Sequence, residues 1–165
     1  MRKSGFTLLE VLIVVIIIGI LAALGWSSMN ELIQTNKAKE ASRTLAAFAE
    51  RAVAEGKMLK DSVKISINAS NTMEARLALT NELLFSQPLS NGFSADNATP
   101  PPGCAKFPNN SVTSRIRIGL SGIGTPGCFV VCNASNYCGS AIKTEGKNTF
   151  TAQVKRKNSN AWEEI

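Results

Sequence analysis

The strongest feature of the hydrophobic pattern is one long apolar run near the start of the chain. The segment 6–25 reads FTLLEVLIVVIIIGILAALG, and from Val11 to Leu24 it contains no polar side chain. In a helix, about 20 apolar residues at 1.5 Å each span the roughly 30 Å hydrocarbon core of a bilayer. The short basic stretch MRKSG precedes the run. The pattern therefore predicts a helix that either crosses a membrane or forms part of an export signal.

Three interpretations of this segment compete. A retained transmembrane helix would keep Arg2 and Lys3 on the cytoplasmic side, as the positive-inside rule requires. A secretory signal would be cleaved after the small residues Ala23 and Gly25, but Glu10 between the basic stretch and the apolar run is atypical of such signals. A buried core helix is rarely so long and so uniformly apolar. The residues alone favour the retained helix, in which a carboxylate beside lipid is costly and suggests that Glu10 has a partner.

The helical pattern continues beyond the apolar run with a different character. Apolar residues recur at spacings of three, four or seven, which is typical of an amphipathic helix, at Ala38, Ala41, Leu45, Phe48, Ala52 and Leu59. No proline interrupts the segment 6–60. We therefore predict one helix of about 50 residues, whose second half packs on a globular head.

The rest of the chain predicts a small head built mainly of strands. Alternating apolar and polar residues are typical of strands and occur at 63–67, 112–118, 128–132 and 150–155. Asn71 and Glu74 have the spacing of a capping box and predict a short helix at 72–86. The composition of 87–110, which includes three consecutive prolines, predicts a loop, and 119–127 predicts a glycine-rich turn. The fold class is therefore α+β: a long N-terminal helix packed on a small, mostly antiparallel sheet.

The composition of the chain excludes several kinds of catalytic and metal-binding site. The 165 residues contain 18 Lys and Arg against 12 Asp and Glu, a formal charge of +6, and no histidine. The missing histidine excludes Ser-His-Asp and Cys-His nucleophile systems and any His-ligated metal site within this chain. We therefore expect no enzymatic activity, no cofactor and no metal.

The four cysteines all lie in the C-terminal third, at Cys104, Cys128, Cys132 and Cys138. They lack the C-x-x-C spacing of zinc knuckles and of thioredoxin-like redox motifs. An even number in an exported domain favours two disulfides, for which three pairings are possible. A bond from Cys104 to any of the other three would tie the proline-rich loop to the sheet.

The N-terminal residues resemble a known family. Gly5-Phe6-Thr7-Leu8-Leu9-Glu10, after a basic leader and before an apolar run, looks like the leader of type IV pilins and type II secretion pseudopilins. The resemblance implies that a prepilin peptidase cuts between Gly5 and Phe6. It implies that Phe6 becomes the methylated N-terminus, and that Glu10 pairs with the N-terminal ammonium of a neighbouring subunit during assembly. Many pilins carry a proline where this chain has Ser27, so a forced kink is not expected here.

With this resemblance, the expected organisation has four parts: a leader at 1–5, a transmembrane half-helix at 6–29, an amphipathic half-helix at 30–60 and a pilin-like head at 61–165. The implied function is a structural subunit of a type IV pilus or a type II secretion pseudopilus. The implied partners are other such subunits, the prepilin peptidase and the bacterial inner membrane. The head would lie in the periplasm before assembly into the filament.

An alternative function is suggested by basic residues in the head. Arg115 and Arg117 share one face of a predicted strand, and three more cations cluster near the C-terminus, at Lys155, Arg156 and Lys157. If these faces adjoin, they form a basic patch able to bind DNA or another anionic surface. The chain would then be a minor pilin that binds DNA, a surface or secretion cargo, although a solvated sheet face is the simpler reading. Three segments, beginning at Asn68, Asn97 and Asn133, also match a glycosylation pattern, which we read as chance.

Overall fold

The computed structural model describes residues 7–90, 92–95, 101, 115–119, 128–143, 150–157, 159 and 161–165. The chain forms two compact units, Met1–Gln34 and Thr35–Ile165. One helix, α1 (Leu8–Leu59), runs through both units. The sequence prediction of a single uninterrupted helix is therefore confirmed.

The C-terminal end of α1 is closed by its own backbone. The Asp61 amide donates to the Gly56 carbonyl at 3.0 Å and the Lys60 amide to the Lys57 carbonyl at 3.3 Å. Lys60 has φ 54°, the left-handed conformation that such a Schellman closure requires. This closure turns the chain back along the helix and into the first strand.

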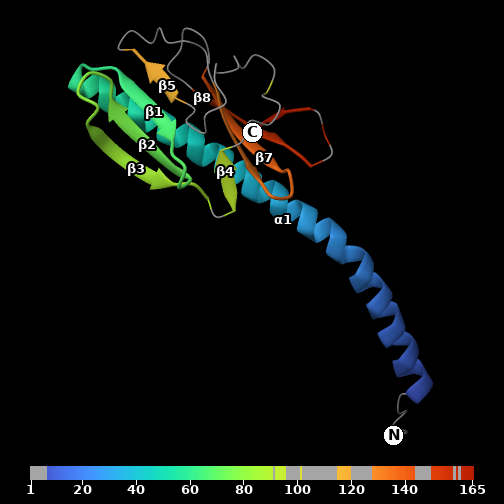
Figure 1. The fold of residues 1–165 in the computed structure, drawn as a ribbon. Helices are drawn as coiled ribbons and strands as arrows, with labels where there is room; N and C mark the ends of the chain where they lie inside the picture. Colours follow the sequence, from blue (N-terminus) through green and yellow to red (C-terminus); the bar gives the residue numbers. More distant parts are fainter. Residues whose placement is uncertain are drawn as a thin grey trace, which may run out of the picture. The chain divides into compact units, whose positions relative to one another are not determined.

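In the second unit, the first sheet has four antiparallel strands in the order β3-β2-β1-β5 (Figure 1). These are β1 (Val63–Ile67), β2 (Thr72–Leu77), β3 (Leu83–Pro88) and β5 (Arg115–Ile118). In β1 the buried residues alternate with half-buried ones, so this sheet has one face in the core.

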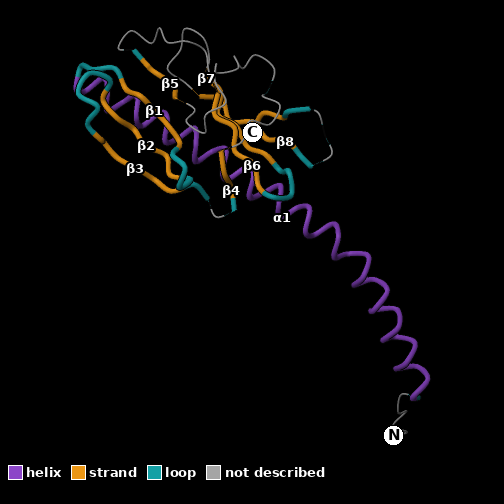
Figure 2. Tube along the Cα trace, viewed as in Figure 1, coloured by secondary structure: helices purple, strands orange, loops and turns teal. Residues whose placement is uncertain are grey.

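The second sheet has five antiparallel strands in the order β4-β6-β7-β8-β9 (Figure 2). They are β4 (Phe93–Ala95), β6 (Cys128–Asn133), β7 (Cys138–Lys143), β8 (Phe150–Lys155) and β9 (Glu163–Glu164). The first five residues of β6 are all buried, so both of its faces are covered. The head thus contains two sheets where the sequence predicted one.

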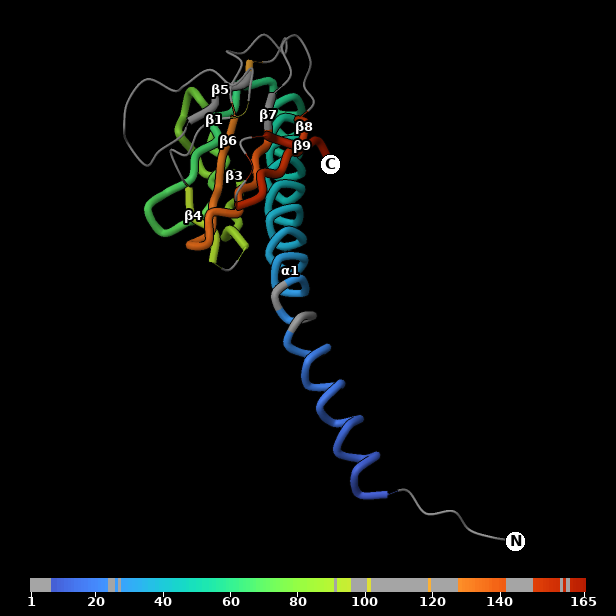
Figure 3. Tube along the Cα trace, turned by 90° about the vertical axis from the view of Figure 1, so that its right-hand side faces the viewer, coloured from blue at the N-terminus to red at the C-terminus, as the bar shows by residue number. Residues whose placement is uncertain are grey.

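The part of α1 that belongs to the second unit packs on both sheets (Figure 3). The predicted apolar stripe is buried from Ala38 to Ala52, whereas Leu59 at its end is 52% exposed. At Gly139 the helix comes so close to β7 that an added Cβ would lie 2.7 Å from the Ala38 carbonyl oxygen. Beside it, the buried Ser42 hydroxyl lies 2.5 Å from the Ser140 carbonyl oxygen and 2.8 Å from that of Gln153. Small residues therefore set the distance between the helix and the second sheet.

The predicted helix at 72–86 is wrong. This segment forms the hairpin of β2 and β3, in which the Leu77 amide donates to the Glu82 carbonyl at 2.9 Å. Met73 and Ala75 are buried while their neighbours are not, so the true period is two. The capping box is wrong as well, because Asn71 adopts φ 54° in a turn and Glu74 lies within β2.

Among the other head predictions, the strands at 63–67, 128–132 and 150–155 are confirmed. The strand at 112–118 is confirmed for 115–118, while 112–114 lie outside the described residues. The prediction of a loop over the whole of 87–110 is wrong for part of this segment. β3 continues to Pro88, and β4 occupies Phe93–Ala95. Most of the predicted turn at 119–127 falls outside the described residues.

Candidate assembly site

The start of α1 is fixed by Thr7. The Glu10 amide donates to the Thr7 hydroxyl at 3.3 Å and to the Thr7 carbonyl at 3.1 Å. Thr7 is therefore the N-cap, and Glu10 occupies the third helical position, where a capping box places an acid. Its negative charge also suits the positive end of the helix dipole. Glu10 thus has a role at the start of its own helix. An experiment on pairing between subunits must distinguish that pairing from this capping role.

The apolar side chains that the structure describes in the first unit are exposed. From Leu8 to Leu21 the large apolar residues are 48–85% exposed. By length and composition, α1 is long and apolar enough to cross a membrane. The large apolar residues described in this segment are not buried within the chain itself, so lipid or other protein chains must cover this surface.

The processing residues Gly5 and Phe6 lie outside the described residues. The structure therefore describes Glu10 but not the amine with which it is predicted to pair. The pairing and the cleavage stay predictions.

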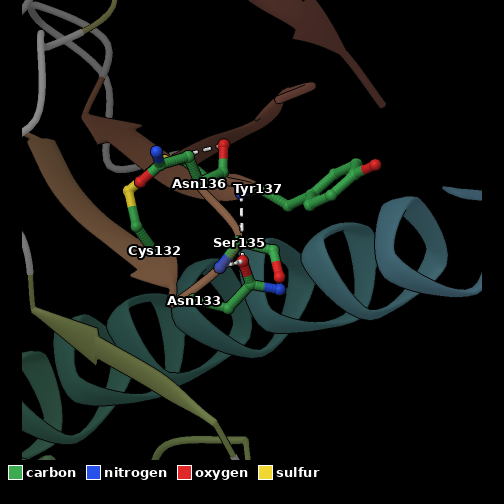
Figure 4. The surroundings of a disulfide bond; sticks show 6 residues. Cys132, Asn133, Ser135, Asn136 and Tyr137 are labelled. Atoms are coloured by element: carbon green, nitrogen blue, oxygen red, sulfur yellow. Dashed lines mark hydrogen bonds between the residues drawn. A yellow bond between two sulfur atoms is a disulfide. The ribbon is translucent and has the colours of Figure 1, made fainter. Parts of the chain in front are cut away.

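Two of the four cysteines are joined in the described part of the head. Cys132 and Cys138 form a disulfide across the ends of β6 and β7, with their Cα atoms 4.1 Å apart (Figure 4). Cys128 is also disulfide-bonded. Cys104 lies outside the described residues. The expectation of disulfides is thus confirmed for Cys132 and Cys138, which excludes two of the three possible pairings.

The turn beneath this disulfide has a counterpart elsewhere in the head. In the β6–β7 turn, the Asn133 side-chain oxygen accepts from the amides of Ser135 and Tyr137, each at 3.0 Å. In the β1–β2 turn, the Asn68 side-chain oxygen accepts from the amides of Ser70 and Thr72, also at 3.0 Å. Both turns read Asn-Ala-Ser-Asn, and the fourth residue has a positive φ in each.

This repeated turn explains two of the glycosylation-like matches. Each first asparagine closes a hairpin by mimicking a backbone acceptor, which is the usual role of asparagine in tight turns. The strand pair that flanks the turn is Cys132 and Cys138 in one hairpin and Ile67 and Met73 in the other. The sequence analysis missed this four-residue repeat, although it is visible in the sequence.

The basic candidates are divided between the two sheets. Arg115 and Arg117 lie on β5 in the first sheet. Lys155 ends β8 in the second sheet, with Lys157 two residues beyond it, and Arg156 pairs with Glu163 at 3.5 Å. By register, Arg117 is opposite Lys64, which in turn is opposite Arg76. By register, a basic alignment therefore runs across the first sheet, and it was not foreseen.

One acidic residue interrupts this basic surface. Glu74 accepts hydrogen bonds from Arg76 Nε at 3.0 Å and from Asn68 Nδ2 at 2.9 Å. The Arg76 hydrogen bond, followed by that from Asn68, lowers the pKa of Glu74 below its ordinary value. Burial opposes this shift, and the Arg76 charge adds the smallest lowering effect. Glu74 is therefore a carboxylate at neutral pH and neutralises Arg76.

No group of three or more potential ligands among the described residues could hold a metal ion. What distinguishes this part of the chain is an exposed apolar helix with one acid in its first turn.

Comparison with known proteins bears on this N-terminal segment. Residues 1–26 match the family model described as the prokaryotic N-terminal methylation motif. The chain carries a prepilin leader signature. This is the signature of type IV pilins and pseudopilins, so the resemblance found in the sequence is confirmed. No curated protein and no solved structure matches the chain.

The leader signature and the apolar helix agree with anchoring in an inner membrane, and the motif supports a pilin-like subunit. The sequence analysis identified the cleavage motif and Glu10 but did not treat Thr7 as a helix cap. The signal for the cap was present in the spacing Thr7-x-x-Glu10.

Proposed function

We propose that this pilin-like chain is a structural subunit of a type IV pilus or a type II secretion pseudopilus. Residues 1–5 are the leader, 6–29 the membrane half of the helix, 30–60 its amphipathic half and 61–165 the head. A prepilin peptidase cuts between Gly5 and Phe6, and the new N-terminus is methylated. Assembly moves the helix from the inner membrane into a filament of like subunits, and no catalysis by this chain is involved.

The observation that carries this proposal is the exposed apolar surface of α1 immediately after a prepilin leader signature. Inside a filament, Glu10 lies among apolar helices, where a lone carboxylate is unfavourable. The Phe6 ammonium of a neighbouring subunit supplies the opposite charge, and N-methylation preserves that charge. Because both groups lie at fixed points of their helices, the pair also fixes the axial position of one subunit against the next.

The experiment compares Glu10→Ala with Glu10→Gln in the producing cells. Glutamine also serves in a capping box but has no charge. We expect both variants to be shortened by five residues and methylated, and both to be absent from sheared filaments. Normal incorporation of Glu10→Gln would show that the helix cap, and not the charge pair, is what Glu10 supplies.

Gly5→Val tests the processing step. A bulky side chain at the cut should leave the leader in place, which the intact mass of the purified protein reports directly. Removal of residues 1–5 from this variant would contradict the proposed cleavage. A mature N-terminus at Trp26 would contradict the whole proposal, because the apolar helix would then be lost.

A second candidate function is supported by the register alignment of Lys64 and Arg117 on neighbouring strands. Such a pair of cations suits an anionic ligand, and the chain would then act as a minor pilin that binds DNA, a surface or cargo. Lys64→Gln combined with Arg117→Gln should weaken a salt-dependent shift of double-stranded DNA. A shift of equal strength in this variant would remove the reason for this candidate.

A further inference from the structure

The edges of the two sheets are protected unequally. Among the described strands, β9 is two residues long and consists of Glu163 and Glu164, and β4 has only three residues. β5 carries two arginines in four residues. By contrast, β3 has six residues, Leu83–Pro88, and none is charged. Natural sheets protect their edges with charges, prolines, bulges or short strands. β3 has only Pro88 at its end and the register shift opposite Ala75 and Arg76, so its uncharged edge is still suited to pairing with another strand.

The outer edge of β3 is long enough to pair with an added strand. Leu83, Ser86 and Gln87 are exposed, whereas Leu84 and Phe85 pack partly into the core. A register shift opposite Ala75 and Arg76 places these two consecutive apolar residues against the core. Pro88 has no amide hydrogen and ends the edge. About five residues, or roughly 17 Å at 3.4 Å each, are therefore available for an added strand.

The helix beside β3 supplies a cationic side chain. The Arg51 guanidinium lies 4.3 Å from the centre of the Phe85 ring, in a cation–π contact. The ion pairs of the described residues join Arg76 to Glu74 and Arg156 to Glu163, and neither involves Arg51. On the same face of α1, at spacings of three, four and seven from Arg51, Ala47, Ala54 and Met58 are exposed. Small alanine side chains leave room for a neighbouring chain.

We propose that the outer edge of β3, together with the Ala47–Arg51–Ala54–Met58 face of α1, binds an extended segment of a partner protein as an added strand. The segment alternates apolar and polar residues and carries a carboxylate that pairs with Arg51. A second copy of this chain is the wrong occupant. Pairing through its own β3 would bring a second Arg51 to the same place, since Phe85 lies near the middle of the strand, and the two like charges would repel.

The test uses the full chain in detergent micelles and three synthetic eight-residue peptides. Each alternates valine and threonine, with a central valine replaced by glutamate, glutamine or lysine. Affinity is measured by fluorescence anisotropy, and amide hydrogen exchange locates the bound peptide. We expect the glutamate peptide to bind about fivefold more tightly than the lysine peptide, as a partly exposed charge pair allows. We also expect slower exchange of the β3 amides.

The decisive variants are charge changes on the helix surface. Arg51→Glu should reverse the order of the glutamate and lysine peptides, and Arg51→Gln should make them equal. Lys57→Glu is the matched control, because Lys57 is exposed and lies about 120° around the helix from Arg51. It should preserve the original order.

Four results would overturn the proposal. One is an unchanged order of affinities in Arg51→Glu. Another is protection from exchange outside β3, or binding of none of the three peptides. The last is self-association of the chain through β3 in place of peptide binding, measured by analytical ultracentrifugation.

Discussion

Two neighbouring residues of β7 should respond in opposite ways to the same substitution. At Gly139, an added methyl group would lie 2.7 Å from the Ala38 carbonyl oxygen and 3.1 Å from the backbone nitrogen of Ser42. These are backbone atoms, so no side-chain rotation relieves the clash. At Ser140 the hydroxyl oxygen is buried and has no hydrogen-bond partner within the described part of the chain. Alanine there removes an unsatisfied polar atom and adds nothing.

The magnitudes follow from these contacts. Overpacking of a buried site costs about 1–3 kcal/mol, and a clash with helix backbone belongs to the upper part of that range. For a unit of this size, about 2–3 kcal/mol corresponds to a fall in Tm of roughly 6–12 °C. Loss of the buried Ser140 hydroxyl should leave Tm unchanged or raise it, because an unpaired hydroxyl costs about 1–3 kcal/mol to bury.

The assay is thermal unfolding of the full chain in detergent, followed by near-ultraviolet circular dichroism. Gly139→Ala and Ser140→Ala are compared with the wild type in one buffer. Equal Tm values for Gly139→Ala and the wild type would refute the close approach of α1 to β7. A fall in Tm for Ser140→Ala comparable to that of Gly139→Ala would show that the hydroxyl has a partner.

Three further predictions concern the turns and charges of the head. Glu74→Gln should lower the free energy of unfolding by about 1 kcal/mol at neutral pH. Because the pKa of Glu74 is lowered on folding, its contribution is complete above about pH 4.5 and disappears as the pH falls through the folded-state pKa, so the variant and the wild type should converge in acid. Asn68→Ala should cost about 1–2 kcal/mol in urea unfolding, because the amides of the β1–β2 turn lose their acceptor. Replacing Cys132 with Ile and Cys138 with Met, the pair at the equivalent place in the other hairpin, should keep the β6–β7 register in amide-exchange maps while lowering stability by about 2 kcal/mol in the chain-entropy model.

Each of these three predictions would be contradicted by a specific result. A constant difference between Glu74→Gln and the wild type from pH 7 to pH 2 would mean that the carboxylate charge is not what stabilises the turn. Unchanged urea midpoints for Asn68→Ala would show that water replaces the side chain at no cost. Loss of protection along the whole of β6 and β7 in the cysteine variant would mean that the disulfide, and not the asparagine turn, sets the register.

The parts of the fold that the sequence predicts are those with one dominant period. The apolar run and the stripe from Ala38 to Ala52 are helical over many turns, and α1 has nearly the predicted bounds. Leu59 departs from the stripe because the helix ends there. The strand at 63–67 alternates cleanly because one of its faces is in the core.

The β2–β3 hairpin was missed because its signal is ambiguous. Met73, Leu77 and Leu84 fit a helical spacing as well as a strand, and the turn between the strands contains neither Gly nor Pro. Asn81, with φ 61°, provides the left-handed residue there instead. The second sheet was missed for another reason: β7 contains Gly139 and Ser140, which have low strand propensity but allow the helix to approach closely.

In the candidate site too, the local motifs could be predicted from the sequence and the pairings between strands could not. The prepilin leader is a local motif, so residues 1–26 could be recognised without a structure. The disulfide between Cys132 and Cys138 depends on a hairpin register, and the alignment of Lys64 with Arg117 joins strands about 50 residues apart. Pairings of this kind follow from topology and not from spacing along the chain.

The position of Trp162 makes its fluorescence a reporter of the disulfides in the head. Its indole packs against the layer formed by Cys128, Val130, Cys132 and Cys138 on the second sheet. A disulfide accepts an electron from an excited indole, so the oxidised protein should fluoresce dimly and brighten when a thiol reagent reduces it. With Trp26 changed to phenylalanine, emission from the remaining tryptophan of the purified protein would follow the redox state of this layer.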